Sequence, residues 1–404
     1  PGGRRPPVVV SGGRRPRAPR ATARIASIPR LQRCARGRRR GTYALVRDHY
    51  LMLALAEGHD EAPVEALLQP DLEPAAVLAD PPRPPAVPPR VARRLADPEL
   101  AAQAKAVAAA ASAAGLQVLV PPDCPPGLPQ SPLRPRALFA RGDVGALHRG
   151  PAVAFVGSRT PTPYGIDAAR ALAAALARAG AVLWSGLARG IDGIAHEACL
   201  AAGVPTVAVL AGGLDAIYPP EHGDLAARIV AGGGCLLAEL PPGRRARRGH
   251  FVRRNRILAM GVHAVVVVEA SLASGALHTA RAAATVGADV YALPGPWRSE
   301  RSQGCHRLLA EGAQGLESAE ALLQGLGLRA SAGPAESLRL AACAEEERLL
   351  QAVGNGPRPT DLLARECALP RPAFLRALFA LEQRGALERL PGDLWRRADG
   401  LTNR

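Results

Sequence analysis

Lysine and aromatic residues are scarce in this chain of 404 residues. Lys105 is the only lysine among 51 basic residues, and it lies in an Ala-rich stretch with high helix propensity. A P-loop requires a lysine after its glycine-rich turn, and Schiff-base chemistry requires an activated lysine, so neither is predicted. Aromatic residues make up 3% of the chain and hydrophobic residues 48%. The core must therefore consist mainly of Ala, Val and Leu.

Cysteine is also sparse and has no metal-binding or disulfide pattern. The seven cysteines are odd in number, widely spaced and form no Cys-x-x-Cys pair. Neither a disulfide framework nor a zinc ribbon is predicted, and we expect no metal and no cofactor. The chain has no run of about 18 apolar residues and no signal-peptide hydrophobic region. We therefore expect a cytoplasmic protein that does not interact with membranes.

Positive charge is concentrated at the N-terminal end. The formal net charge is +16, and residues 1–41 contain thirteen arginines without one acidic residue. Their Arg, Pro and Gly composition predicts a disordered extension, with a nucleic-acid-binding arm as the alternative. The other 363 residues are nearly neutral, so a basic function there requires local clustering of arginine.

The remaining sequence divides into four segments. Residues 42–115 predict a small helical domain of the SAM or helix-hairpin type, and residues 326–340 form a Gly/Ala/Ser-rich linker. Between them, residues 116–325 alternate short apolar strands with helices, which predicts an extended Rossmann-like, doubly wound α/β fold. Residues 341–398 read as three helices followed by a hairpin, which is the order of a winged helix.

Two glycine turns that follow predicted strands each carry an arginine. They are Gly157-Ser158-Arg159 and the turn from Ser185-Gly186 to Arg189. Ligands bind beyond the carboxyl ends of strands in this fold, where glycine admits a ligand to the backbone and arginine binds phosphate. Each turn alone could be purely structural, but together they predict phosphate binding. Ser274-Gly275 predicts either another anion-binding turn or a plain helix cap.

The segment 244–256 holds seven arginines and no carboxylate. Its first part, which includes Arg248, is either a solvated charged face or a phosphate contact. Residues 251–256 combine an aromatic side chain that can stack on a base with groups that can bind phosphate and base edges, which predicts a grip on single-stranded nucleic acid. The residues concerned are Phe251, Arg253, Arg254, Asn255 and Arg256. The structural alternative, compatible with the first, is a helix N-terminus with Asn255 as its cap.

No catalytic constellation is recognisable. His196 and Glu197 are sequence neighbours and point in different directions on a helix. The histidines at 222, 263, 278 and 306 lack metal-ligand spacing, and we expect them to be surface or packed residues. Asp192 and Glu269 lie near strand ends, where an acid would be useful, so an enzyme remains an alternative.

Seven motifs follow one another over about 116–325. They are Val-Gly-Ser-Arg-Thr-Pro-x-x-Tyr-Gly at 156–165, Ser-Gly-Leu-Ala-Arg-Gly-Ile-Asp at 185–192, Leu-Ala-Gly-Gly-Leu-Asp-x-x-Tyr-Pro-Pro-Glu at 210–221, Glu-Leu-Pro-Pro-Gly at 239–243, Phe-Val-Arg-Arg-Asn-Arg-Ile at 251–257, Val-Val-Glu-x-x-x-x-Ser-Gly at 267–275 and Ala-Leu-Pro-Gly at 292–295. Together they resemble the DNA-processing protein DprA/Smf family. So many collinear motifs are far more specific than a single glycine turn.

The resemblance implies a dimeric protein without catalytic turnover, which binds single-stranded DNA in a basic pocket and loads the RecA recombinase during natural transformation or DNA processing. Gly157, Ser158 and Arg159 would meet phosphate. The stacking and cationic wall would consist of Phe251, Arg253, Arg254 and Arg256, with Asn255 ordering the loop. Substitution of Arg254 or Arg256 should then weaken binding to every sequence. The chain departs from the family at Val252, where proline is usual, and at His306, where asparagine is usual.

Two other functions compete with this one. The first is a nucleotide hydrolase of the "lonely guy" type, although its Pro-Gly-Gly-x-Gly-Thr-x-x-Glu motif is only partly echoed at 211–215. The second is a duplex-binding regulator that acts through the winged helix. The third helix of that domain, at 371–384, carries three arginines but also Glu382, so its basic face is thin and protein contacts are favoured.

Overall fold

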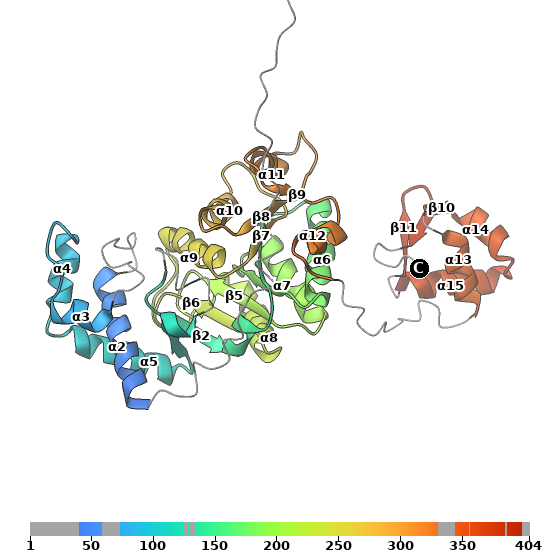
Figure 1. Ribbon diagram of the computed structural model, residues 1–404. Coiled ribbons are helices and arrows are strands. Elements are labelled where there is room, and N and C mark those ends of the chain that lie inside the picture. The colour runs from blue at the N-terminus through green and yellow to red at the C-terminus, as the bar shows by residue number, and fades with distance from the viewer. Residues whose placement is uncertain are drawn as a thin grey trace, which may run out of the picture. The chain divides into compact units, whose positions relative to one another are not determined.

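The computed structural model (Figure 1) describes residues 40–58, 73–124, 128, 134–329, 344–354, 356–383 and 386–397. The predicted extension, up to residue 39, and residues 330–340 of the predicted linker lie outside the described residues. Contacts divide the chain into two units, Pro1–Ala330 and Ser331–Arg404. Each unit is described separately below.

The described residues of the first unit form a nine-stranded sheet in the order β1-β2-β6-β5-β4-β3-β7-β8-β9. Strands β3 to β9 pair in parallel, which confirms the predicted Rossmann-like class. The antiparallel edge formed by β1 and β2 was not predicted. The strands are β1 Gln117–Leu119, β2 Leu138–Gly142, β3 Ala152–Val156, β4 Val182–Ser185, β5 Thr206–Leu210, β6 Cys235–Ala238, β7 Ala264–Val267, β8 Asp289–Ala292 and β9 Gln314–Gly315.

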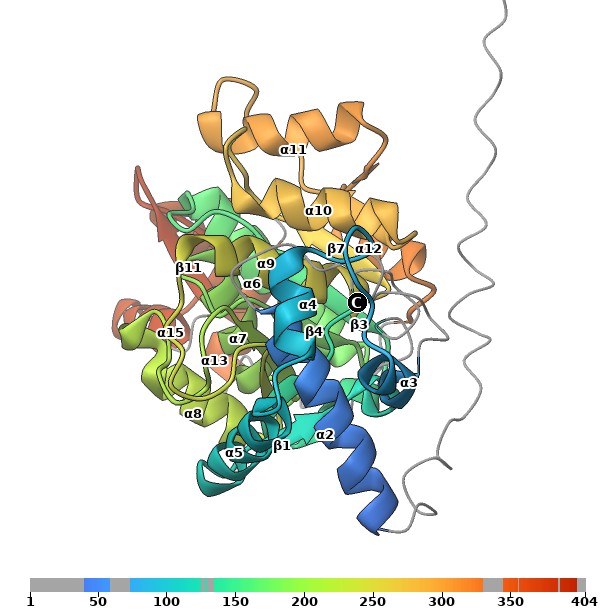
Figure 2. The same cartoon turned by 90° about the vertical axis from the view of Figure 1, so that its left-hand side faces the viewer.

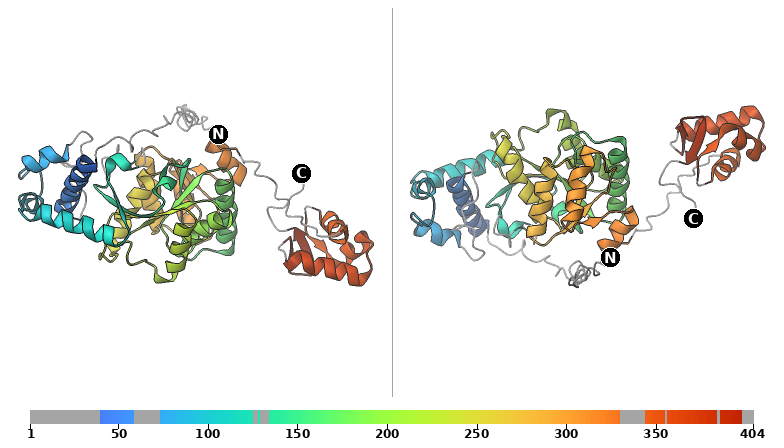
Figure 3. Two further views of the ribbon diagram at one scale, coloured as in Figure 1. Left: turned by 90° about the horizontal axis from the view of Figure 1, so that it is seen from below. Right: turned by 90° about the horizontal axis from the view of Figure 1, so that it is seen from above.

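Helices cover both faces of this sheet, as Figures 1 and 3 show. Because β3, β4, β5, β6 and β7 are wholly buried, they carry Val, Leu, Ala and Phe on both faces. One face packs against α9 Arg248–Met260, α10 Gly275–Thr285 and α11 Glu300–Ala310. The other packs against α6 Pro163–Arg178, α7 Ile191–Ala201, α8 Gly223–Ala231 and α12 Ala319–Gly325. Short 3-10 turns occur at Pro121–Asp123, Val144–His148 and Pro220–His222.

Among the described residues, four helices precede the sheet: α2 Arg40–Glu57, α3 Pro74–Ala79, α4 Pro89–Leu95 and α5 Leu100–Ala113. Figure 2 looks onto these helices. Leu51 of α2 and three alanines of α5 belong to the same apolar cluster as side chains of β2, β5 and β6. Glu57 and Arg136 form a buried ion pair that joins the end of α2 to the segment before β2. These helices therefore pack directly on the sheet, and the boundary at 115/116 stays a prediction.

In its described part, residues 344–354, 356–383 and 386–397, the second unit has three helices and a three-stranded sheet in the order β10-β12-β11. Its elements are α13 Ala344–Val353, β10 Arg358–Pro359, α14 Thr360–Cys367, α15 Arg371–Gln383, β11 Leu387–Leu390 and β12 Leu394–Arg397. Trp395 of β12 packs with Leu349, Phe374 and Leu381 in its core. This arrangement confirms the predicted winged helix. No helix within the described ranges of either unit is long and apolar enough to cross a membrane.

Candidate nucleic-acid interface

The turns after β3 and β4 pack tightly against each other. A side chain at Gly157 would lie 2.8 Å from Cγ1 of Ile191, and one at Gly190 would overlap the carbonyl oxygen of Ser158. The backbone N–H of Ile191 donates to that same carbonyl at 3.1 Å. Gly190 also has φ +74°, a conformation that favours glycine. The glycines therefore let two loops approach, and Arg159 and Arg189 project from these loops as exposed side chains.

Two buried carboxylates hold these loops in place. Asp192 accepts hydrogen bonds from the backbone N–H groups of Gly186, at 3.1 Å, and Ala188, at 3.3 Å. Burial raises the pKa of the Asp192 carboxyl, an effect that nearby Arg254 and the two N–H groups partly offset. Glu269 accepts from the backbone N–H of Thr162 at 2.9 Å and from its hydroxyl. The two acids considered for catalysis are thus occupied as structural acceptors.

Residues 251–256 lie inside helix α9, so the expectation of a loop ordered by Asn255 was wrong, and so was the alternative of a helix N-terminus with Asn255 as its cap. The helix begins at Arg248 with Arg247 as its N-cap residue. The ring Nδ1 of His250 accepts the backbone N–H of Arg247 at 3.1 Å, which closes the first turn. Asn255 instead donates to the carbonyl of Gly275 at 3.2 Å and accepts from Nε of Arg254 at 3.0 Å. It therefore links α9 to the start of α10.

Three of the four arginines of α9, at 253, 254 and 256, point into the protein, which corrects the expectation of a cationic wall. Arg253 pairs with both carboxylate oxygens of Glu239, at 2.8 and 2.9 Å, and Arg256 pairs with the same carboxylate. Arg254 is 6% exposed and donates to the carbonyl of Gly186 at 2.6 Å and to that of Val209. Burial lowers the pKa of Arg254 to about 10, so it remains charged at neutral pH.

Phe251, in the first turn of α9, contacts both an arginine and a second aromatic side chain. The guanidinium carbon of Arg159 lies 5.5 Å from the centre of the Phe251 ring. The Tyr218 ring meets the Phe251 ring edge to face, with centres 5.6 Å apart and planes 70° apart. These three residues, here called the aromatic platform, line a small pocket together with Gly186, Ala188, Arg189 and Pro219. Tyr218 was not predicted as a site residue, although it stands in the 210–221 motif.

Cations around the platform differ in their availability. Within the described ranges, no carboxylate pairs with Arg159, whereas Arg189 forms an exposed ion pair with Glu221. Arg248 is exposed at the start of α9. Ser158 accepts the N–H of Thr160 at 3.2 Å, so its hydroxyl shapes its own turn.

The other predicted site residues have structural contacts. Ser185 is buried and donates to the carbonyl of Phe155 at 2.5 Å. Ser274 caps α10 by accepting the N–H of Ala276 at 3.2 Å, and Gly275 follows it. Ser274 and Gly275 join the rest of the site through Asn255 of α9. The structure thus gathers all the predicted residues around α9 and the two glycine turns, but only some of them face solvent.

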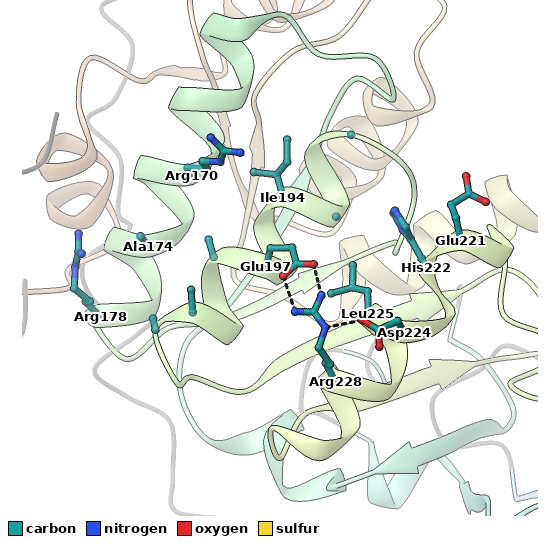
Figure 4. Close-up of a pocket in the computed structure, with 15 residues that line it drawn as sticks. Arg170, Ala174, Arg178, Ile194, Glu197, Glu221, His222, Asp224, Leu225 and Arg228 are labelled. Carbon is teal, nitrogen blue, oxygen red and sulfur yellow. Dashed lines mark hydrogen bonds and ion pairs between the residues drawn. The ribbon is translucent and has the colours of Figure 1, made fainter. Parts of the chain in front are cut away.

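A larger pocket of about 840 Å³ lies between α6, α7 and α8 (Figure 4). Its charges are balanced, because Arg228 pairs with Glu197 and Asp224. The remaining charged lining residues are Arg170, Arg178 and Glu221. A polyanion gains little from such a balanced surface, so the pocket is a weaker candidate for nucleic acid than the aromatic platform.

Comparison with known proteins identifies the family. Residues 117–327 match the family model for DNA recombination-mediator protein A, and residues 332–393 match the DprA winged helix domain. The chain belongs to the DprA family. Its relatives include protein Smf of Escherichia coli, which is 38% identical over 284 residues, 68% of this chain and 76% of that protein. These matches confirm the expected family and its winged helix.

Two solved structures of DprA proteins are similar. DprA of Streptococcus pneumoniae is 27% identical, with a TM-score of 0.56 over 68% of this chain and 97% of that one. DNA processing protein A of Helicobacter pylori, whose single-stranded DNA binding mode has been described, is 30% identical, with a TM-score of 0.48 over 52% of this chain and 95% of that one. The first supports the fold of this DprA-family chain.

Proposed function

We propose that this DprA-family protein binds single-stranded DNA at the aromatic platform. The observation that carries the proposal is the contact of Phe251 with both the Arg159 guanidinium and the Tyr218 ring. A nucleobase can stack on such an aromatic group whatever its identity, and Arg159 can reach the adjoining phosphate. Bases in a duplex are already stacked on one another, so this platform favours a single strand.

The buried arginines of α9 act on this site as positioning residues. Arg254 donates to the carbonyls of Gly186 and Val209 and so fixes the helix to the sheet. Gly186 follows β4, and Val209 lies near the end of β5. Arg253 and Arg256 fix the helix to Glu239. Their charges also raise the positive potential at the sheet edge, since burial weakens solvent screening. We assign direct phosphate contact to Arg159, Arg189 and Arg248.

Backbone and hydroxyl groups complete the proposed DNA contacts. Gly157, Ser158 and Gly186 lie in the two turns beside the platform. Ser274 and Gly275 lie at the start of α10, which Asn255 joins to the platform helix. Ser185 is buried and contributes by supporting the end of β4. The glycines leave room for a strand to approach the backbone of these turns, while the N–H of Gly186 itself is held by Asp192.

We propose that this binding involves no chemical turnover. Asp192 and Glu269 accept backbone hydrogen bonds, so neither carboxylate is placed as a general base. The nucleotide-hydrolase alternative predicts release of free adenine from AMP. Incubation with AMP and chromatographic detection of adenine tests that alternative, and a time-dependent, enzyme-dependent release would support it over the present proposal.

The family membership supports a role in recombination. We propose that the protein acts as a homodimer that protects incoming single strands and loads the RecA recombinase. The winged helix would serve protein contacts, since Leu375 and Phe379 are exposed on α15, at 40% and 60%, beside Arg371 and Arg376. Apolar side chains on a recognition helix suit a protein partner better than a phosphate backbone. Strand-exchange assays with purified RecA and sedimentation of the free protein test these two roles.

Fluorescence anisotropy across a salt series tests the DNA-binding proposal. Residues 42–404 are used, because the thirteen arginines of residues 1–41 would attract any polyanion. Labelled oligo-dT is compared with a duplex of matched length. We expect tighter binding of the single strand and a logarithmic salt slope of about −0.7 for each phosphate contact. Equal affinity for both forms, or no binding, would contradict the proposal.

A further inference from the structure

Trp297 is the most exposed large hydrophobic side chain of the described residues, at 75% exposure. It lies in the segment between β8 and α11, and the guanidinium carbon of Arg298 sits 4.8 Å from the centre of its ring. Leaving an indole in water forgoes the free energy that its burial would provide. Trp297 and Arg298 thus repeat, at a second place, the pairing of aromatic ring and arginine seen in the aromatic platform.

Both arginine–aromatic pairs lie at the same edge of the sheet. Strands β3, β7 and β8 are parallel neighbours, so the segments that follow them emerge together. Arg301 donates to the hydroxyl of Thr160, at 3.2 Å, and Tyr164 donates to the carbonyl of Pro294 at 2.7 Å. Thr160 is the neighbour of Arg159. The Trp297 segment is therefore tied to the loop that carries the arginine of the platform.

His306 of α11 also contacts the segment that carries Trp297. Its ring Nε2 lies 3.0 Å from the carbonyl oxygen of Gly295, so the histidine supplies a hydrogen bond where the family usually has asparagine. A side chain at Gly295 would overlap Ser302 of α11, which brings this backbone close to the helix. The backbone that carries Trp297 is thus fixed by several contacts. A fixed backbone loses less conformational entropy when a ligand binds.

We propose that Trp297 and Arg298 form a second base-stacking subsite for the same DNA strand that occupies the aromatic platform. The inference rests on the proposed single-strand binding. The platform pocket includes Gly186 and Arg189, which follow β4, whereas Trp297 follows β8. Three strand spacings separate β4 from β8, roughly 15 Å in all, which a few nucleotides can span. The exposed charges of the segment are Arg298 and Arg301 against Glu300, so it retains a net positive charge. An indole face accepts any base, as a sequence-tolerant binder requires.

The tryptophan content of the chain makes this subsite directly observable. Of three tryptophans, Trp184 and Trp395 are buried, at 0% and 4% exposure. Solvent-accessible tryptophan emission therefore comes from Trp297. We expect long oligo-dT to quench this emission in the full chain and an oligonucleotide too short to span both places to quench it weakly. The Trp297→Phe variant should lose the quench while keeping most of its affinity.

Affinity provides the second readout. Trp297→Ala should weaken binding of long oligo-dT about tenfold, corresponding to the loss of one stacked base, and leave short oligo-dT unchanged. Phe251→Ala should weaken both lengths. Leu45→Ala is the control, since it removes an exposed apolar side chain from α2 and should change neither. All variants keep residues 1–41, whose contribution is then common to them.

The outcomes separate the two proposals. Loss of binding in Phe251→Ala, with no quench in the parent chain and unchanged affinity in Trp297→Ala, would overturn the second subsite and leave the platform intact. Unchanged affinity in both variants would overturn the platform and the subsite together. A Trp297→Ala chain that binds long oligo-dT normally but fails to bind RecA would assign the indole to a protein contact and overturn the subsite.

Discussion

The guanidinium of Arg254 fills the space beside Gly186 that a side chain at that position would need. It donates to the carbonyl oxygen of Gly186 at 2.6 Å and also to that of Val209. An arginine from a helix on one face of the sheet thereby satisfies two backbone acceptors at the ends of neighbouring strands. Arg254 therefore stabilises the fold beneath the proposed DNA site and is not itself a proposed DNA contact.

Replacement of Arg254 should therefore damage the fold more than it removes a DNA contact. In Arg254→Met, the carbonyls of Gly186 and Val209 would lose a buried donor, and Asp192 would lose its nearby cation. We expect the free energy of unfolding to fall by about 3 kcal/mol. Denaturant titration measures this change, with Arg245→Ala, an exposed arginine in the same basic run, as the control. Equal stability of Arg254→Met and the parent would contradict this role.

Removal of platform side chains should weaken DNA binding and leave the free energy of unfolding nearly unchanged. Phe251→Ala or Arg159→Ala should weaken oligo-dT binding about tenfold, as expected for one lost stacking or phosphate interaction. The free energy of unfolding should change by less than about 1 kcal/mol, since Arg159 is exposed and Phe251 only partly buried. Val252→Ala, on the adjacent exposed position of α9, is the control. A binding loss in Val252→Ala equal to that in Phe251→Ala would argue against stacking.

Neutralising Glu221 should strengthen DNA binding. Arg189 is paired with this exposed carboxylate, so part of its charge is compensated before DNA arrives. Exposed pairs contribute at most about 1 kcal/mol, and Glu221→Gln should leave stability nearly unchanged. We expect a few-fold gain in affinity for oligo-dT and a steeper salt slope, by at most about 0.7. Glu311→Gln, which alters an ion-paired carboxylate remote from the platform, is the comparison. An unchanged salt slope in Glu221→Gln would remove Arg189 from the contact set.

Acid should destabilise the first unit through His196. This side chain is fully buried, its Nδ1 lies 2.9 Å from the hydroxyl of Thr206, and burial lowers its pKa to about 3. The hydroxyl of Thr206 donates to the carbonyl of Leu183, so it accepts from a neutral imidazole. The folded state binds protons less readily than an unfolded chain with a histidine pKa of about 6.5.

The stabilisation by neutral His196 is thus complete above pH 6.5 and declines as the pH falls toward 3. Between pH 7 and pH 5, this group alone should cost about 2 kcal/mol of unfolding free energy. Unfolding titrations at both pH values, compared with His196→Gln, isolate its part. The variant should show a shallower loss of stability, and an equal loss in both proteins would exclude His196 as the responsible group.

The central sheet was predictable from sequence because its strands carry an unambiguous signal. Short apolar runs such as Val265 to Val268, closed by glycine or a polar residue, alternate with amphipathic helices, and six of them became β3 to β8. Strand β2 gave no comparable signal, since it includes Arg141 and Gly142 and pairs with distant β6. Its place at the sheet depends on long-range pairing that local pattern does not report.

The chemistry of α9 was harder to predict for a physical reason. A run of arginines without carboxylates indicates an exposed basic surface, yet Arg253 and Arg256 are compensated by Glu239, fourteen or more residues earlier in the chain. Only the fold brings that acid beneath the helix. Tyr218 was not predicted because its contact with Phe251 is formed by the fold and is not visible in the sequence. Arg159 could be selected in advance because it follows a predicted strand, and Phe251 because it stands beside arginines in the 251–257 motif.

Polar contacts also join the N-terminal helices to the rest of the first unit, beside the apolar packing of α2 and α5 on the sheet. Glu57 and Arg136 are buried together, and Arg253 donates to the carbonyl of Gly58 at 3.2 Å while it holds Glu239. A chain shortened to begin after α5 would leave Arg136 without its acid and remove an acceptor from the helix that bears Phe251. The helices and the sheet should consequently melt in one cooperative step, and the winged helix, which has a core of its own, in another. Calorimetry would then record two transitions. Because α2 unfolds together with the sheet, its thermal unfolding would also abolish DNA binding at the aromatic platform.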